Sequence, residues 1–195
     1  MMKTIKTIIA ILAVSIFAMS CSKDDDPSLP LAIAPLQDPL AGYLSASGLY
    51  QKVSIKINGP DYEFGYSFIP LVNGKMTAIV AKIPDIRMAM RVTIWDKVAG
   101  TVLLTEAIDI VAAGVVVTKQ ISPLDLVKNK EYFITINSND WYERKRTDNN
   151  SAFYPITVGD LQITSYSCRS GTAQAIPNSP QNNFYSGDLS FTFQK

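Results

Sequence analysis

Short runs in which apolar and polar residues alternate constrain the fold of this chain more than any other feature. Three of them are KVSIKI at 52–57, MAMRVTIW at 88–95 and LSFTFQ at 189–194. Because successive side chains of a β-strand point to opposite faces, this period predicts strands with one buried face and one face in water. The residues expected on buried faces are Val53, Ile55, Ile57, Met88, Met90, Val92, Ile94, Leu189, Phe191 and Phe193. Arg91 and Thr93, on the other side of the second run, are expected to face water.

Further strands are expected at 64–69, 76–83, 102–107, 115–121, 132–137 and 161–166. Turns that contain glycine, a residue that tolerates positive φ, separate several of them: NGPD at 58–61, VNGK at 72–75 and KVAGT at 97–101. Many short strands divided by turns predict an all-β protein, an antiparallel β-sandwich with a jelly-roll-like topology. A single helical turn is expected at 124–128.

The first twenty residues carry the pattern of an export signal rather than of a folded element. Lys3 and Lys6 precede an uncharged apolar run at 7–20, which is shorter than the roughly 20 residues of a membrane-spanning helix. Four prolines between Pro27 and Pro39 favour an extended spacer after it. The expected organisation is therefore a signal peptide at 1–20, a flexible tether at 21–39 and a β-sandwich domain at 40–195.

The tetrapeptide AMSC, which ends at Cys21, resembles a bacterial lipobox, in which a small residue precedes a cysteine that becomes lipidated. The resemblance implies that acyl chains on Cys21 anchor the mature protein in a membrane. The next five residues resemble the acidic export tag of surface lipoproteins of Bacteroidota; they are Ser22, Lys23, Asp24, Asp25 and Asp26. This second resemblance implies an outer-membrane protein exposed at the cell surface. The alternatives are a secreted protein with an incidental cysteine and a merely solvated charge run.

Another resemblance covers residues 64–141, under half of the chain. Its segments FIPLVNGKMTAIVAKIPD, MRVTIWDKVAGTVLLTEAI and VVVTKQISPLDLVKNKEYFITI follow the order found in uncharacterised jelly-roll modules of bacterial surface proteins, which are similar to carbohydrate-binding domains. Matching places are held by Phe68, Pro70, Gly74, Trp95, Gly100, Pro123, Leu126 and Tyr132. Asn129 stands where glycine is common in these modules. All matched residues are structural, so the resemblance implies a fold and no site.

Composition excludes several classes of chemistry. The chain has no histidine, which excludes Ser-His-Asp and Cys-His catalysis and imidazole metal sites. A lipidated Cys21 leaves Cys168 as a single thiol, expected to be a small buried residue rather than a disulfide partner or zinc ligand. The 18 Lys and Arg residues against 17 Asp and Glu give no basic surplus for nucleic acid. We therefore expect no cofactor, no metal and no nucleic-acid partner.

A glycosidase activity would need two carboxylates that face each other across a cleft, about 5–10 Å apart. The candidate pairs are Asp61 with Glu63 and Asp140 with Glu143. With 17 acidic residues in the chain such pairs arise by chance, so the expectation is a protein that is not an enzyme.

The segment 137–154 is the candidate ligand-binding loop. Its candidate residues are Trp141, Tyr142, Glu143, Arg144 and Arg146. Aromatic faces suit sugar rings, charged groups can bind hydroxyls, and loops on a rigid sandwich commonly carry binding residues. The alternative is a polar hairpin in which Trp141 packs on the rim and the charges face water. A second polar loop spans 168–188, and the sequence leaves open whether the two loops meet.

These features predict a non-catalytic cell-surface lipoprotein whose β-sandwich binds a ligand, with a glycan as the first expectation. The alternative is a structural or assembly subunit of an envelope or fimbria-like complex, in which an edge strand such as 189–194 pairs with a protein partner. An exposed Trp141 in a polar concavity would favour a ligand. A flat apolar surface beside an unpaired edge strand would favour assembly.

Overall fold

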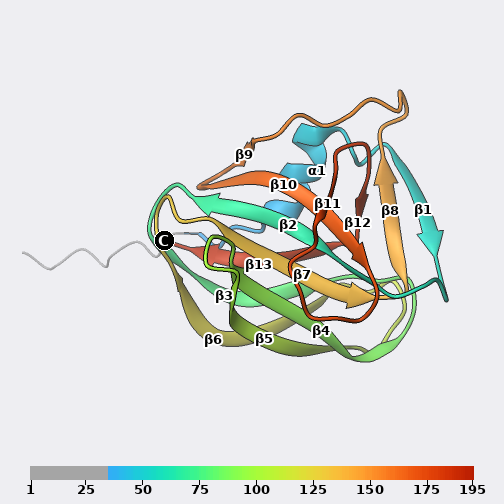
Figure 1. Cartoon of the computed structure of the whole chain (residues 1–195), viewed down its shortest axis with the longest axis horizontal. Coiled ribbons are helices and arrows are strands. Elements are labelled where there is room, and N and C mark those ends of the chain that lie inside the picture. Colours follow the sequence, from blue (N-terminus) through green and yellow to red (C-terminus); the bar gives the residue numbers. More distant parts are fainter. Residues whose placement is uncertain (1–34) are drawn as a thin grey trace, which may run out of the picture. The chain divides into compact units, whose positions relative to one another are not determined.

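Antiparallel strands make up most of residues 35–195, the part of the chain that the computed structural model describes (Figure 1). In chain order the elements are α1 (Pro39–Ser47), β1 (Lys52–Lys56), β2 (Tyr62–Pro70), β3 (Gly74–Ala81), β4 (Arg87–Asp96), β5 (Thr101–Ile110), β6 (Val117–Leu126), β7 (Tyr132–Ser138), β8 (Trp141–Lys145), β9 (Ile156–Val158), β10 (Leu161–Ser170), β11 (Ser179–Gln181), β12 (Tyr185–Ser186) and β13 (Leu189–Gln194). Each strand expected from the alternating runs is present. The expected signal peptide, Cys21 and the acidic tag lie outside the described residues.

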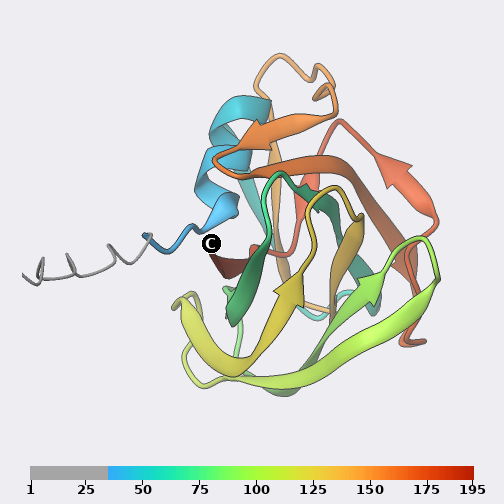
Figure 2. The ribbon, with the colours of Figure 1, turned by 90° about the vertical axis from the view of Figure 1, so that its left-hand side faces the viewer.

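Three antiparallel sheets build the sandwich (Figure 2). The largest has the order β11-β10-β2-β7-β4-β5 with β9 added to β10, the second has the order β13-β3-β6, and the third has the order β1-β8-β12. Aromatic side chains of the first two sheets meet in the core, where the ring centroids of Phe68 on β2 and Phe191 on β13 are 4.6 Å apart. The predicted all-β sandwich is confirmed.

The buried face of β4 follows the prediction only after an irregularity. Met90, Val92 and Ile94 are buried, as expected. Met88 is 59% exposed, so its predicted burial is wrong. Ala89 has a positive φ of 50°, and the pairing of β4 with β5 changes register just before Met90. Such a bulge turns the preceding side chain to the opposite face.

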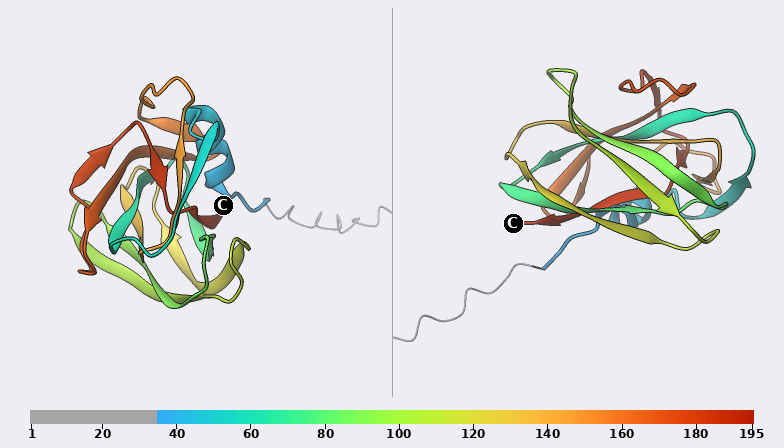
Figure 3. Two further views of the ribbon diagram at one scale, coloured as in Figure 1. Left: turned by 90° about the vertical axis from the view of Figure 1, so that its right-hand side faces the viewer. Right: turned by 90° about the horizontal axis from the view of Figure 1, so that it is seen from below.

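β1 contradicts the expected burial more completely. Val53, Ile55 and Ile57 are 47%, 58% and 47% exposed. β1 is an outer strand of the sheet β1-β8-β12 and pairs only with β8. It lies at the rim of the described fold (Figure 3). Nothing in residues 35–195 therefore covers its apolar face.

The helix α1 is an element that the sequence analysis missed. Its first turn is capped by Asp38, whose side chain accepts a hydrogen bond from the Leu40 N–H, and Pro39 occupies the first position. It ends at Gly48, whose φ of 75° is the left-handed conformation common after helices. Tyr43 is buried and anchors the helix to the core.

The fold begins before the expected boundary at residue 40. Gln37 and Phe193 exchange two backbone hydrogen bonds of 2.8 Å, and the Leu40 N–H donates to the Ser190 hydroxyl at 3.3 Å. The outer edge of β13, proposed above for pairing with a partner, is thus partly covered by the chain itself.

Turn geometry differs from expectation at several places. Of the glycines in the three expected turns, only Gly100 has a positive φ, of 67°, whereas in the 58–61 turn Asn58 adopts a φ of 54°. The segment 124–128 contains the end of β6 and not the predicted helical turn. The chain turns after it at Asn129, with a φ of 64°, a conformation that asparagine tolerates in place of glycine.

Candidate functional site

The segment expected to be a binding loop contains a strand. Residues Trp141–Lys145 form β8, which pairs with β1 on one side and with β12 on the other. Strand geometry directs Trp141 and Glu143 to one face of the sheet and Tyr142 and Arg144 to the other. The five predicted ligand residues therefore do not form one cluster.

Tyr142 and Arg144 are engaged with neighbouring elements of the fold. The Arg144 Nε and one terminal nitrogen donate to the two carboxylate oxygens of buried Asp188, each at 2.5 Å. These hydrogen bonds raise the pKa of Arg144. The Lys82 ammonium lies 5.1 Å from the centre of the Tyr142 ring. Both side chains contribute to packing between the sheets.

The other face of β8 borders a pocket of about 290 Å³, which we call the aromatic pocket. Its lining residues come from β2, β8, β10 and the segment 181–186, and they are Tyr62, Phe64, Trp141, Glu143, Tyr166, Cys168, Gln181, Phe184 and Ser186. Aromatic rings dominate this set, and one carboxylate accompanies them. Elements far apart in the sequence thus meet at a single concavity.

Edge-to-face ring pairs form the walls of the aromatic pocket. Trp141 is 9% exposed, and its ring centroid lies 5.5 Å from Tyr62 and 5.7 Å from Phe64. Tyr166 and Phe184 form a second such pair at 5.9 Å. Trp141 is therefore packed among other rings, which agrees with the alternative in which it packs against the sandwich, and its ring face is not exposed for a ligand. The half-buried Tyr62 and Phe184 are the rings that a ligand can reach.

Polar groups lie beside these rings. The Oε1 atom of Glu143 is 2.9 Å from the Nζ atom of Lys145, and that Nζ atom is 5.8 Å from the centre of the Phe184 ring. Gln181 adds an amide to the lining. Cys168 is a free, half-buried thiol whose pKa is raised by burial, and it is less buried than the sequence predicted.

The two polar loops do meet. The Ala152 N–H donates to the Asn182 carbonyl at 2.6 Å, and the Ser151 hydroxyl donates to the Asn182 side chain at 3.1 Å. They border a more polar pocket lined by Arg146, Asn150, Ser151, Phe153 and Asn182. Phe153 is 87% exposed there, and Arg146 is paired with Asp148 at 2.6 Å. Arg146 is thus separated from the other predicted ligand residues.

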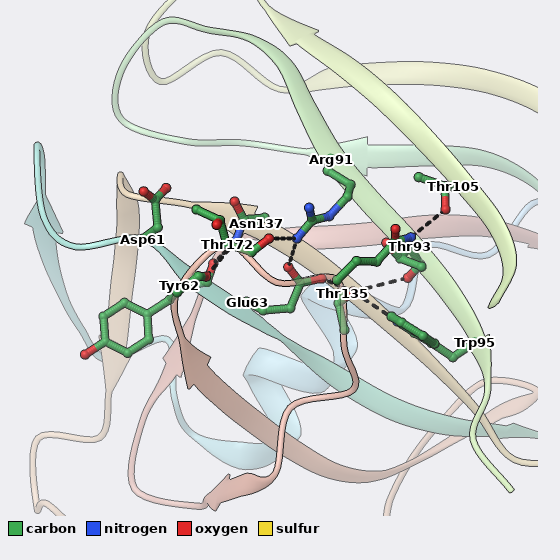
Figure 4. Close-up of polar contacts among 12 residues, drawn as sticks. Asp61, Tyr62, Glu63, Arg91, Thr93, Trp95, Thr105, Thr135, Asn137 and Thr172 are labelled. Atoms are coloured by element: carbon green, nitrogen blue, oxygen red, sulfur yellow. Dashed lines mark hydrogen bonds and ion pairs between the residues drawn. The ribbon is translucent and has the colours of Figure 1, made fainter. Parts of the chain in front are cut away.

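The polar side of the large sheet is partly covered. The expectation that Thr93 faces water is wrong, because Thr93 is buried, and the Arg91 side chain is only 26% exposed. Glu63 is 0% exposed and accepts a hydrogen bond of 2.7 Å from Arg91, which also donates to the Thr172 carbonyl at 2.8 Å (Figure 4). Thr93 is buried and accepts from Gln174 at 3.2 Å. The segment after β10 therefore covers part of this side and supplies hydrogen-bond partners to Arg91 and Thr93.

In each candidate carboxylate pair, the two carboxylates have different neighbours. Glu63 binds Arg91, whereas Asp61 lies 3.4 Å from Arg87. Asp140 is buried and accepts from the Asn58 N–H at 2.6 Å, while Glu143 lies in the aromatic pocket. Neither pair combines its carboxylates in one pocket.

Comparison with models of known protein families finds none that matches this chain, and comparison with curated proteins finds no match either. Within residues 35–195, no three side chains of His, Cys, Asp or Glu gather closely enough to hold a metal ion. The helix in this part of the chain lacks the length and apolar character needed to cross a membrane. The functional argument therefore depends on the geometry of the aromatic pocket.

Proposed function

We propose that this protein is a non-catalytic, lipid-anchored cell-surface module whose β-sandwich binds a glycan in the aromatic pocket. The observation that carries the proposal is the presence of Tyr62, Phe184, Glu143 and Gln181 around one concavity. Aromatic rings pack against the C–H faces of a sugar, and a few fixed polar groups bind its hydroxyls. The pocket of about 290 Å³ is at the small end of the range for ligand sites, which suits one sugar unit.

A neighbouring pocket supports an oligosaccharide rather than a single sugar. It shares Tyr62 and Cys168 with the aromatic pocket and is otherwise lined by Arg169, Ser170, Asn178 and Ser179. Amides, hydroxyls and a guanidinium are the donors and acceptors that sugar hydroxyls require. A second sugar unit can lie here.

The proposed anchor is Cys21, and the proposed address is the outer membrane with the module facing outward. Both are inferred from the resemblance of residues 18–26 to a lipobox followed by an acidic export tag. The partners in this proposal are the membrane, through the lipid, and a glycan, through the pocket.

A glycan-array screen of residues 22–195 tests the binding proposal, with Tyr62→Ala and Tyr50→Ala run in parallel. Tyr50 is 56% exposed and does not line the pocket, so it is a matched control. We expect binding that Tyr62→Ala abolishes and Tyr50→Ala retains. Thermal unfolding of each variant separates a lost contact from a lost fold. Absence of any bound glycan, or equal binding by both variants, contradicts the proposal.

A second candidate function, assembly with a protein partner, is favoured by β1. Its outer edge is unpaired within residues 35–195, and Val53, Ile55 and Ile57 are exposed on one face while Lys52 and Lys56 are exposed on the other. An antiparallel strand that is apolar on one face and acidic on the other would complement it.

This candidate is tested by the size of the complex extracted from the envelope, compared between wild type, Ile55→Lys and Val98→Lys. Val98 lies in the β4–β5 turn and is an exposed control. Loss of a larger complex in Ile55→Lys alone supports assembly, and a wild-type protein that is monomeric throughout contradicts it.

A further inference from the structure

We infer that the aromatic pocket recognises a positively charged nitrogen of its ligand, such as the free amino group of an amino sugar or the quaternary ammonium of a choline headgroup. The amino-sugar form deepens the glycan proposal and rests on it. The shared chemistry is an ammonium group held between a carboxylate and aromatic rings.

The charge of the pocket supports this selectivity. Of the described residues that line it, Glu143 is acidic and none is lysine or arginine. Glu143 pairs with Lys145, which lies outside the lining. Where that lysine turns away, the carboxylate attracts an ammonium group and repels an anionic sugar. The aromatic rings act in the same direction, because the negative face of a π system attracts cations.

The ring geometry provides such faces from more than one direction. The planes of Trp141 and Tyr62 are inclined by 73°, and those of Tyr166 and Phe184 by 75°. In a near-perpendicular pair, one ring presents its face where the other presents its edge. Of these four rings, Tyr62 and Phe184 are half-buried and within reach of a ligand, and a cation against an accessible ring face makes the contact used in known ammonium cages.

The chain itself already places an ammonium group beside this pocket. The Nζ atom of Lys145 is 2.9 Å from Glu143 and 5.8 Å from the Phe184 ring centre. The Lys145 side chain is 36% exposed and does not line the pocket. Pairs of this exposure are weak, so a ligand ammonium can replace Lys145 as the partner of Glu143 while the lysine turns to water.

The test compares two tetrasaccharides, glucosamine and its N-acetylated counterpart, which differ in the charge of the nitrogen. Affinities for residues 22–195 are measured by calorimetry at a pH where the free amine is protonated, with choline chloride as a third probe. We expect the glucosamine tetramer to bind about tenfold more tightly than the acetylated one, the ratio expected for one desolvated cation–π and ion contact.

Matched variants assign the effect to the carboxylate. Glu143→Gln should remove the preference, whereas Glu106→Gln should keep it, because Glu106 is also paired with a lysine, Lys119 at 2.7 Å, but lies on β5 outside the pocket. Lys145→Ala should tighten binding of the amino form, since it removes the competing ammonium. A role of Glu143 in folding alone would not produce that gain.

The outcomes separate the inference from the proposed function. Equal binding of both tetrasaccharides, unchanged in Glu143→Gln, overturns the inference and leaves glycan binding in place. Binding of choline but of neither tetrasaccharide, lost in Glu143→Gln, supports the ammonium site and overturns its amino-sugar form. Failure of all three probes to bind overturns the ammonium site, and the glycan array then decides the proposed function separately.

Discussion

The guanidinium of Arg144 on β8 forms two hydrogen bonds of 2.5 Å with the carboxylate of Asp188, which precedes β13. This pair connects β8, in the sheet β1-β8-β12, to the residue that precedes β13, in the sheet β13-β3-β6. Asp188 is 3% exposed, so without Arg144 its carboxylate would be buried without this partner. The arginine predicted to bind a ligand therefore holds two sheets together.

Arg144→Met should lower the free energy of unfolding by about 3 kcal/mol, because it leaves a buried carboxylate unpaired. Urea unfolding measures this change. The double variant Arg144→Met with Asp188→Leu should recover part of the loss, because no charge then remains unpaired. Glycan binding should persist in the folded variants, since Arg144 does not line the aromatic pocket. A single variant within about 0.5 kcal/mol of wild type would contradict the role given to this pair.

Arg91→Leu should be severe, although the alternating pattern of β4 predicts a mild effect. The substitution leaves the fully buried Glu63 without its cationic partner, and we expect a loss of about 3 kcal/mol in urea unfolding. Adding Glu63→Gln should restore part of the stability, because a neutral amide at 63 needs no counter-charge. If the double variant is no more stable than Arg91→Leu, the ion pair is not the cause.

The sequence was sufficient for nine of the strands and for the sandwich, because alternation is a local property of the chain, but β8, β9, β11 and β12 were not predicted. Burial was harder to predict, because it depends on which strand faces are covered by the rest of the fold. The run 52–57 alternates as well as 189–194 does, and β1 and β13 are both outer strands of their sheets. The apolar face of β1 is nevertheless exposed, whereas that of β13 is buried in the core. The bulge at Ala89 likewise left no pattern that could be read beforehand.

The aromatic pocket could be predicted only in part. Trp141 and Glu143 are among the residues that the sequence predicts for a ligand site, but WYERK lacks apolar alternation and predicts a loop where the structure has β8. Tyr62, Tyr166 and Gln181 were missed because β2, β10 and β11 come together through pairings between distant segments, such as Phe64 opposite Cys168. A single sequence gives no local signal for such long-range register.

Acid should destabilise the fold through Glu131. Burial raises the pKa of this carboxyl, but hydrogen bonds from Thr164 and Lys97 outweigh it and hold the pKa below its ordinary value. A lowered folded-state pKa stabilises the protein above the unfolded-state pKa of about 4.3, and this contribution is lost as the pH falls through the folded value.

The urea midpoint should therefore decrease as the pH is lowered from about 6 to about 3, and it should decrease less steeply in Glu131→Gln. Glu106→Gln is a control, because that carboxyl lies on β5 and pairs with Lys119 on β6, away from Thr164 and Lys97. An identical slope for wild type and Glu131→Gln would show that Glu131 does not contribute.

Cys21→Ala should release the protein from the membrane fraction, because it removes the proposed site of acylation. Replacing Asp24, Asp25 and Asp26 by alanine should leave the protein anchored but protected from protease added to intact cells. Fractionation and protease digestion measure the two effects. Retention of Cys21→Ala in the membrane contradicts lipidation, and unchanged protease sensitivity of the aspartate variant contradicts the export tag.

Cys168 provides a chemical reporter for the aromatic pocket, because residues 22–195 contain no other thiol. Burial raises the pKa of the Cys168 thiol, so less thiolate is present and alkylation by iodoacetamide should be slower than for a free cysteine peptide. A ligand in the aromatic pocket should slow it further by covering the sulfur. Mass spectrometry measures the rate with and without the glycan selected on the array, and Cys168→Ser confirms the labelled position. A rate that does not change at saturating ligand would place the bound glycan elsewhere, with the polar pocket beside Phe153 as the next region to test.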